Sequence, residues 1–271
     1  MTSNAPGQRQ ARVVRPCMWR SAAASLGVAC ACTQAFADEQ PSVTPYRPSV
    51  STPAALSAPG WLEIEAGGLV SRGSGAARRD SLGYTFKLAF TEDWGLRVGG
   101  DARARQTDEA GARAQGSGDA SVVLKRRMAI DEASAFGVEA GVTLPTGSKG
   151  IGSAESDYSL NTIYSADFGG YHADLNLLAT RFGARDPGLA RVQTLGAVAL
   201  SRSINDRWGL VMELSGTRQR GAPGTAQLLV AGSFNAAKTL TLDAGVARTV
   251  RPGATGWSVF AGLTLLGPRL F

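Results

Sequence analysis

The residue best suited to acid–base chemistry is His172, the only histidine in the chain. Asp174 follows it two positions later, and a Ser-His-Asp hydrolase could use this pair if a serine nucleophile lay within hydrogen-bond reach. No motif in the sequence places such a serine. We therefore predict that His172 is a polar strand residue and that the chain has no catalytic residues. A lipid hydrolase is a distant alternative.

The residue types also disfavour phosphate loops and metal sites. Gly147-Ser148-Lys149-Gly150 faintly suggests a phosphate-binding loop, but it lacks the G-x-x-x-x-G-K-[ST] spacing and no helical pattern follows it. All three cysteines, Cys17, Cys30 and Cys32, lie close to the N-terminus. A chain that has lost this region keeps one histidine and no cysteine, so we predict no metal site and no cofactor.

Charged and apolar residues alternate most clearly between Leu82 and Gln106. Every second residue from Leu82 to Phe90 is apolar, and after Thr91-Glu92-Asp93 the alternation resumes at Trp94. A period of two over this length predicts two strands joined by a tight turn. Each strand is about ten residues long, which is enough to cross a bilayer at a tilt. Aromatic residues beside the turn suit a membrane interface, so the hairpin favours a membrane barrel over a soluble sandwich.

The same reading extends along the chain and predicts an all-β fold, an antiparallel transmembrane β-barrel of twelve strands. The connections alternate between short turns and longer glycine-rich loops. An even number of strands with this asymmetry places both ends of the barrel in the periplasm. The predicted strands are 61–71, 82–90, 94–106, 119–128, 135–144, 157–166, 171–182, 190–202, 208–217, 226–234, 240–248 and 257–266.

Ten charged side chains share the predicted inward phase of these strands. One interpretation is a selective pore lining, and the other is a paired network that fills a narrow lumen. The turn at 130–134 is short, so Lys125 should lie nearly opposite Glu139. Arg126 falls in the lipid-facing phase, where it can reach the interface. The ten lumen candidates are Lys87, Arg97, Asp101, Arg103, Lys125, Arg127, Glu139, Asp174, Glu213 and Asp243.

The region before the barrel divides into two parts. Residues 1–37 have an arginine-rich start, an apolar run and Ala35-Phe36-Ala37 before Asp38, as in a cleaved signal peptide; a lipoprotein signal at Cys30 or Cys32 is the weaker alternative. Loss of its four arginines lowers the formal charge of +6 to +2, which gives no case for nucleic-acid binding. Residues 38–60 are rich in proline and serine and predict an extended linker, either periplasmic or inside the barrel mouth. The barrel itself spans 61–271.

Three stretches resemble the outer-membrane "transporter" family named for the MetA pathway of phenol degradation. They are Gly116–Arg127, the Leu-Pro-Thr-Gly loop within Gly141–Leu160, and Ser201–Gly216. The resemblance covers roughly Trp61–Phe271. It implies a twelve-stranded outer-membrane barrel and the passage of small, possibly aromatic molecules. It implies no reaction and no catalytic residue.

Together these observations predict a barrel in the bacterial outer membrane that takes up a small molecule. A structural or adhesion barrel that acts through its outer loops is the main alternative. The expected partners are outer-membrane lipid, an unidentified small molecule and the barrel assembly machinery, which would read the terminal Phe271. The match to that terminal signal is imperfect, because Pro268 interrupts strand pairing.

Overall fold

The computed structural model describes residues 40–250 and 255–271, so the predicted signal peptide lies outside the described residues. Within this part of the chain no helix has the length and apolarity needed to cross a membrane. The strands are β1 (Trp61–Arg72), β2 (Arg78–Ala89), β3 (Trp94–Thr107), β4 (Arg113–Gly116), β5 (Ala120–Ala129), β6 (Ser134–Leu144), β7 (Asp157–Phe168), β8 (Tyr171–Arg181), β9 (Val192–Ser203), β10 (Trp208–Gln219), β11 (Gln227–Ala237), β12 (Leu240–Thr249) and β13 (Trp257–Arg269).

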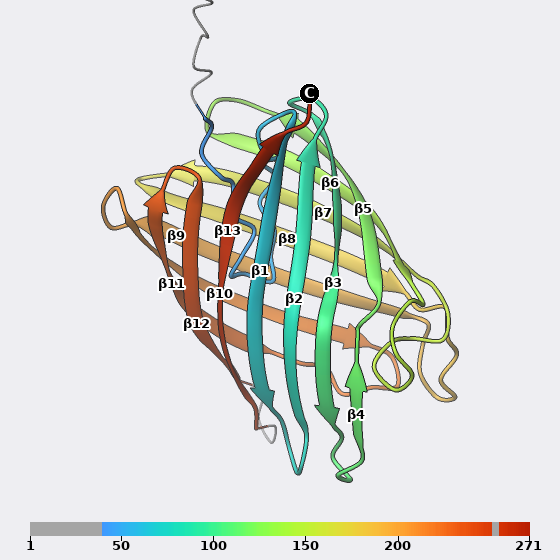
Figure 1. The fold of residues 1–271 in the computed structure, drawn as a ribbon. Helices are drawn as coiled ribbons and strands as arrows, with labels where there is room; N and C mark the ends of the chain where they lie inside the picture. The colour runs from blue at the N-terminus through green and yellow to red at the C-terminus, as the bar shows by residue number, and fades with distance from the viewer. Residues whose placement is uncertain (1–39, 251–254) are drawn as a thin grey trace, which may run out of the picture. The chain divides into compact units, whose positions relative to one another are not determined.

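Twelve of these strands form a closed antiparallel barrel (Figure 1). Each long strand pairs with the next one along the chain, and β1 pairs with both β2 and β13, which closes the ring. Closure leaves no long strand with an unpaired edge, as a structure in a bilayer requires. The predicted all-β, twelve-stranded architecture is confirmed.

The strands run further toward the longer loops than the sequence pattern predicted. The expected loop at 72–81 shrinks to 73–77, because β2 already begins at Arg78. The expected loop at 107–118 contains the short strand β4, which pairs with the end of β3. Polar residues at these strand ends hid the extension, since strands that leave the apolar layer no longer alternate between apolar and charged residues.

A β-bulge in β3 changes which face its last residues occupy. Gly83 pairs with Asp101 and Leu82 pairs with Arg103, so Ala102 is an extra residue on β3. An extra residue shifts the alternation by one position, and every later side chain changes face. Arg103 therefore lies on the outer face, and its predicted inward position is wrong. Ala104 takes the inward position and is fully buried.

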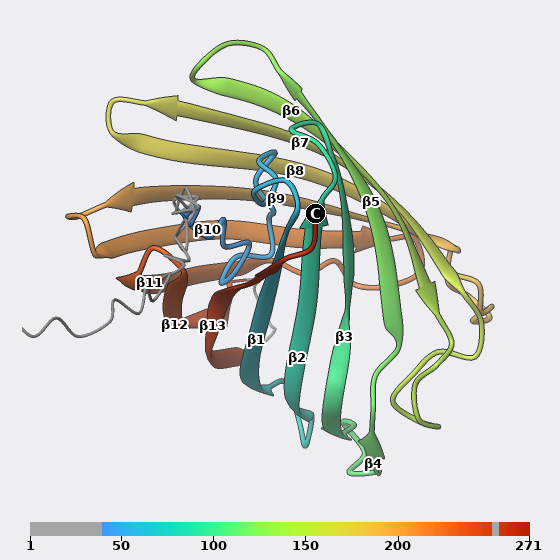
Figure 2. The ribbon, with the colours of Figure 1, turned by 45° about the horizontal axis from the view of Figure 1, so that its top comes forward.

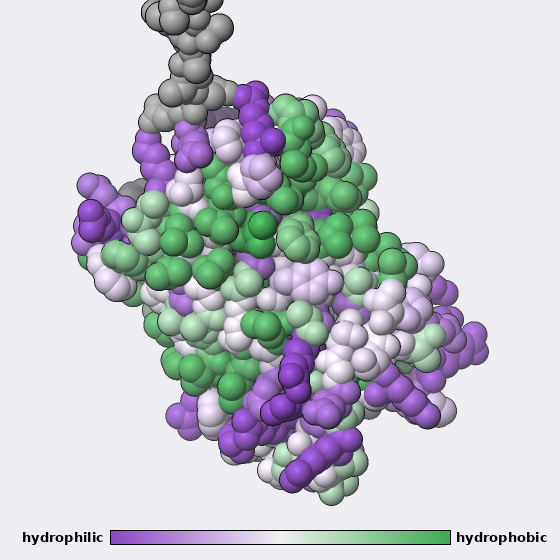
Figure 3. All heavy atoms as spheres, viewed as in Figure 1, coloured by the Kyte–Doolittle hydropathy of each residue, from purple (hydrophilic) through white to green (hydrophobic). Residues whose placement is uncertain are grey.

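The two faces of the barrel wall differ in polarity. The outward side chains are mainly apolar, such as Phe86 and Leu214. Figure 3 shows apolar residues over much of the face formed by β13, β1, β2 and β3. The inward side chains include buried glutamates and lysines. A polar interior behind an apolar outer wall is the arrangement of a membrane-spanning barrel. The protein therefore belongs in the bacterial outer membrane.

The two ends of the barrel carry different connections. Four-residue turns such as 90–93 and 130–133, together with the two-residue turns 169–170 and 238–239, lie at the end where β13 finishes. Longer connections such as 145–156 and 182–191 lie at the opposite end. We call these the short-turn end and the long-loop end. Pro268 lies within the last strand, at a register shift opposite Trp61 and Glu63, where a missing N–H is tolerated.

Candidate functional site

Residues 40–60 lie inside the ring of strands, which answers the question that their composition left open (Figure 2). The segment enters at the short-turn end, where the Val43 N–H donates to the Lys238 carbonyl at 2.9 Å. It leaves at the same end, where the Gly60 N–H donates to the Ala89 carbonyl at 2.9 Å. Between these points it follows a looped path and makes only one isolated strand-like bridge, Pro59 with Ala89. We call residues 40–60 the lumen segment.

The first lumen contact centres on Lys87 of β2. Its ammonium pairs with Glu63 at 2.9 Å and with Glu65 at 2.7 Å, both from β1. The lumen segment completes this cluster, since Thr44 and Tyr46 donate their backbone N–H groups to the two carboxylates. The ammonium also donates to the Thr44 carbonyl at 2.5 Å and lies 4.1 Å from the Tyr46 ring centroid. These contacts satisfy three buried charges with groups of one short peptide.

The second contact centres on Glu139 of β6. Lys125 is its direct register partner on β5, and the two side chains pair at 3.4 Å, which confirms the predicted juxtaposition. Arg97 approaches the same carboxylate at 3.4 Å, and Asn161 donates to it at 3.1 Å. Lys125 also donates to the Tyr46 hydroxyl at 3.1 Å and to a carbonyl of the lumen segment. Wall and segment therefore share one buried network.

Three further wall side chains bind the backbone of the lumen segment. Glu213 of β10 accepts hydrogen bonds from the Ser51 N–H at 2.8 Å and from its hydroxyl at 2.7 Å. Asn176 of β8 accepts from the Thr52 N–H and donates to the Thr52 carbonyl, as a strand partner would. Ser165 of β7 accepts from the Ala54 N–H at 2.7 Å. The segment is thus bonded from several sides of the ring.

A further contact is a fork between Arg47 and Asp243 of β12. The guanidinium binds both carboxylate oxygens, at 3.0 and 3.1 Å. Two glycines that are register partners, Gly67 and Gly262, make room for it, because a Cβ added at either position would lie about 2.5 Å from guanidinium atoms. A fork of this kind fixes orientation as well as charge. The wall is therefore shaped around this arginine.

Beyond Arg47, toward the long-loop end, the lumen has an apolar side and a polar side. The apolar side is a buried cluster of Leu229, Ala231, Ala247 and Phe260, with Leu69 and Val211 packed against it. The polar side is a cavity of about 270 Å³ bounded in part by Arg47, Glu65 and Arg97. A molecule that came from the long-loop end would meet these surfaces, Arg47 included, before it reached the rest of the lumen segment.

Nine of the ten predicted lumen residues face inward, and Arg103 does not. Asp101 lies near the long-loop end, where Arg79 pairs with it at 2.5 Å, and Arg127 lies near the short-turn end. Whether these residues line a conducting path stays a prediction. The prediction omitted Glu63 and Glu65, although they occupy the polar phase of the first strand. It also omitted Tyr46 and Arg47. The one sequence feature that could have identified them is that each is a large side chain in a proline-rich stretch.

His172 does not meet a serine in a catalytic arrangement. Its ring nitrogens contact Asp167 at 2.7 Å and Asp174 at 3.1 Å. The Ser165 hydroxyl donates to Asp174 rather than to His172, at 2.5 Å. A serine nucleophile needs a base as its hydrogen-bond partner, but here the serine binds the aspartate. The cluster therefore lacks the Ser-His-Asp order of a catalytic triad. Among the described residues no group of three or more metal-ligating side chains is present.

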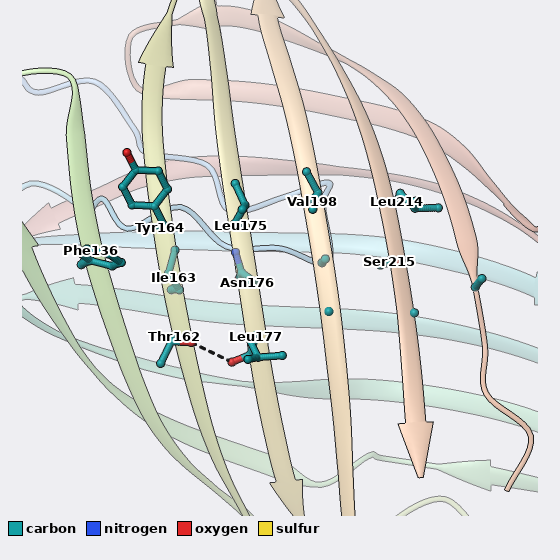
Figure 4. A pocket seen from close by; sticks show the side chains of 14 residues that line it. Phe136, Thr162, Ile163, Tyr164, Leu175, Asn176, Leu177, Val198, Leu214 and Ser215 are labelled. Atoms are coloured by element: carbon teal, nitrogen blue, oxygen red, sulfur yellow. Dashed lines mark hydrogen bonds between the residues drawn. The ribbon is translucent and has the colours of Figure 1, made fainter.

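A separate depression of about 570 Å³ lies on the outer wall across β6 to β10 (Figure 4). The side chains of Tyr164, Leu175 and Leu177 border it, and Gly196 leaves open space in it, because an added Cβ there would meet nothing within 4 Å. The inward Asn176 lies on the other side of this wall, with its amide bonded to the lumen segment. The depression therefore belongs to the lipid-facing surface and not to the lumen.

No protein-family model and no curated protein matches the sequence, so membership in the MetA-pathway family stays a prediction. Several solved structures share the fold. The COG4313 outer membrane channel from Pseudomonas putida F1 is similar with a TM-score of 0.63 and 14% identity, over 79% of this chain and 98% of that one. The NanC porin gives 0.58 and 9%, over 74% and 98%. The KdgM porin in complex with disordered oligogalacturonate gives 0.53 and 12%, over 75% and 98%. The chain has the fold of outer-membrane channel barrels.

Proposed function

We propose that the protein is an outer-membrane channel for a small molecule, closed at rest by the lumen segment. The observation that carries the proposal is how the segment is held. Its contacts with the wall are hydrogen bonds, ion pairs and packing, and its only strand-like contact is the bridge between Pro59 and Ala89. It can therefore move without loss of any wall pairing. The shared fold with channels and porins supports the same function.

We further propose that the small molecule has an apolar or aromatic part. The buried cluster around Phe260 gives the lumen an apolar side next to the charged one. Such a mixed surface suits a ligand with one apolar and one polar part. The resemblance to the MetA-pathway family points the same way, because it implies passage of small and possibly aromatic molecules.

A sealed structural barrel is the second candidate. It is favoured by the pairing of three buried charges, since Lys87, Lys125 and Glu139 all have partners within the lumen. A paired network of this kind fills a lumen and stabilises the ring even if it never opens. Such a protein would act through its outer loops, and removal of the lumen segment would destabilise it without revealing a selective path.

Conductance in planar bilayers separates the two candidates. We expect low conductance for the wild type and a several-fold increase after deletion of residues 40–57. A disulfide between Ala54→Cys and Gly137→Cys should abolish the remaining low conductance until it is reduced, because a Cβ at position 137 would lie 3.3 Å from the Ala54 Cα. If the deletion and the reduced lock conduct no better than the oxidised lock, the segment is not a gate.

The substrate proposal needs a comparison between solutes. Liposomes that contain the deletion variant should admit a membrane-impermeant aromatic sulfonate faster than a sugar of similar mass. Phe260→Ser removes the largest apolar side chain from the buried cluster and should reduce this preference. Equal rates for the two solutes would leave a channel without the proposed selectivity.

A further inference from the structure

We infer that the outer wall formed by β13, β1, β2, β3 and β4 binds a phosphorylated, multiply acylated lipid at the long-loop end. The lipid with this chemistry in an outer membrane is the lipopolysaccharide of the outer leaflet. The inference rests on a cluster of arginines on the outer face and on an apolar groove that continues from it. It is independent of any opening of the lumen.

The arginines are brought together by the strand register. One row across the outer face contains Arg113, Thr107, Arg78, Arg72, Trp257 and Arg248, each the register partner of the next. The bulge in β3 adds Arg103 and Arg105 to the same face, with Arg105 opposite Asp80. Figure 3 shows strongly hydrophilic residues gathered at this end of the face and apolar residues beyond them. Guanidinium groups are the side chains best suited to phosphate.

This cluster has an excess of positive charge. Arg78 pairs with Asp80 at 2.8 Å, and Arg72 lies over the Trp257 ring at 6.0 Å. For Arg103, Arg105 and Arg113 the described residues show no ion-pair partner. Arg72 and Arg78 also face each other directly across the strand pair, an arrangement of like charges that is destabilising by itself. An anion placed between them would remove that repulsion.

The arginines border a depression that is large enough for a headgroup. It has a volume of about 840 Å³ and is lined by Arg72, Arg78, Arg105 and Arg113, among other residues. Asp80 is the carboxylate in its lining, and Asp108 and Glu109 lie in the adjoining connection between β3 and β4. The surplus of arginine over acid favours an anionic ligand. The site faces the membrane rather than the lumen.

A second depression, of about 510 Å³, adjoins the first and shares Asp80 and Arg105 with it. Its lining is mainly apolar and includes Val70, Leu82 and Val259, all of which are exposed. Gly68 leaves a gap in its floor, because an added Cβ would meet only one atom, at 4.0 Å. An apolar groove that begins at an arginine cluster fits an acyl chain attached to a phosphorylated headgroup. A free phosphate has no acyl chain that could fill the groove.

The other end of the outer wall provides the contrast. Arg126 and Arg202 also face outward there, and each is stacked on an aromatic ring, at 5.2 Å over Trp94 and 5.0 Å over Tyr171. They lie on different sides of the barrel and border neither depression. The apolar depression across β6 to β10 has no arginine in its lining, and the polar depression beside it, which also contains Gly196, has one, Arg218. At the β13–β4 face, by contrast, four arginines line a depression that adjoins an apolar groove.

Native mass spectrometry of the detergent-purified full-length mature protein tests the headgroup contact. Bisphosphorylated, hexa-acylated lipid A is titrated against phosphatidylethanolamine. We expect the wild type to retain lipid A preferentially, and the triple variant Arg72→Gln, Arg78→Gln, Arg105→Gln to need about tenfold more lipid, the equivalent of one lost charge-assisted contact. Arg126→Gln with Arg202→Gln is the matched control and should bind as the wild type does. Equal loss in both variants, or no preference in the wild type, overturns the inference.

A second pair of variants tests the acyl groove. Gly68→Leu fills the groove beside the arginines, whereas Gly196→Leu fills the depression on the other side, where an added Cβ has nothing within 4 Å. Gly68→Leu should weaken lipid A binding and leave binding of the deacylated bisphosphorylated headgroup unchanged, and Gly196→Leu should change neither. If Gly68→Leu has no effect, or if the deacylated headgroup binds as tightly as lipid A, the ligand is a free phosphate and not a lipid. Unchanged heat-modifiability on gels confirms that each variant is folded.

Discussion

The charged side chains inside the barrel and the arginines on its outer wall differ in whether they have partners within the protein. Lys87 and Lys125 are buried to within 3% exposure and bind carboxylates, carbonyls and an aromatic ring of the same chain. Arg103 and Arg105 are exposed and have no ion-pair partner among the described residues. A buried charge without a partner costs several kcal/mol, whereas an exposed one is solvated. The unpaired arginines of the outer wall therefore cost little, and an external ligand can reach them.

The largest effect is expected from Lys125→Met, which removes a lumen cation. Breaking a buried ion pair typically costs about 3–5 kcal/mol, and Glu139 would keep only Arg97 and its neutral donors. Thermal unfolding in detergent measures the loss. Lys149→Met is the control, because its exposed loop position predicts a change within about 0.5 kcal/mol. Equal shifts of the unfolding temperature in the two variants would mean that the lumen cation is no more important for stability than an exposed one.

A smaller loss is expected from Phe86→Arg, which tests how far down the outer wall an arginine is tolerated. Phe86 is exposed on the lipid face, and arginine there costs roughly 2–4 kcal/mol near the midplane of the bilayer. Val70→Arg, in the row of Asp80 and Arg105, should cost only about 0–1 kcal/mol. Folding yield into vesicles compares the two. A similar cost for both would mean that the arginines do not mark an interface.

The smallest effect is expected at Asp119, which lies in the connection between β4 and β5. Like the charges of the lumen, its carboxylate has hydrogen-bond partners within the protein. Burial acts to raise its pKa, but hydrogen bonds from Ser153, Gly147 and Thr146 outweigh it and lower the pKa below the ordinary value. Because the folded pKa is depressed, the stabilisation is present above the ordinary value of about 3.9 and is lost as pH falls through the folded pKa. The amide protons of Gly147 and Ser153 should titrate together below about pH 3.9 by NMR. In Asp119→Asn this titration should vanish, and its persistence would assign it to another group.

Much of the wall could be predicted from the sequence, because apolar and polar residues alternate along each strand. The pairing of Lys125 with Glu139 follows from the short turn and the period of two. Arg103 could not be placed, because a single inserted residue changes the face without any change in composition. The binding of Tyr46 and Arg47 could not be predicted either. Their contacts with Lys87 and Asp243 join positions far apart in the chain, and a proline-rich stretch has no periodicity to interpret.

The path of the lumen segment has a mechanical consequence. Both of its ends lie at the short-turn end, so a pull on residue 40 toward that end loads the contacts one after another. The bonds at Val43 and Thr44 would break first, then the Arg47–Asp243 fork, and Ser51 with Glu213 only afterwards. Sequential peeling requires less force than breaking all these bonds together. A push from the long-loop end would press on the whole loop at once, so the segment resists force from the long-loop end more strongly than force from the short-turn end.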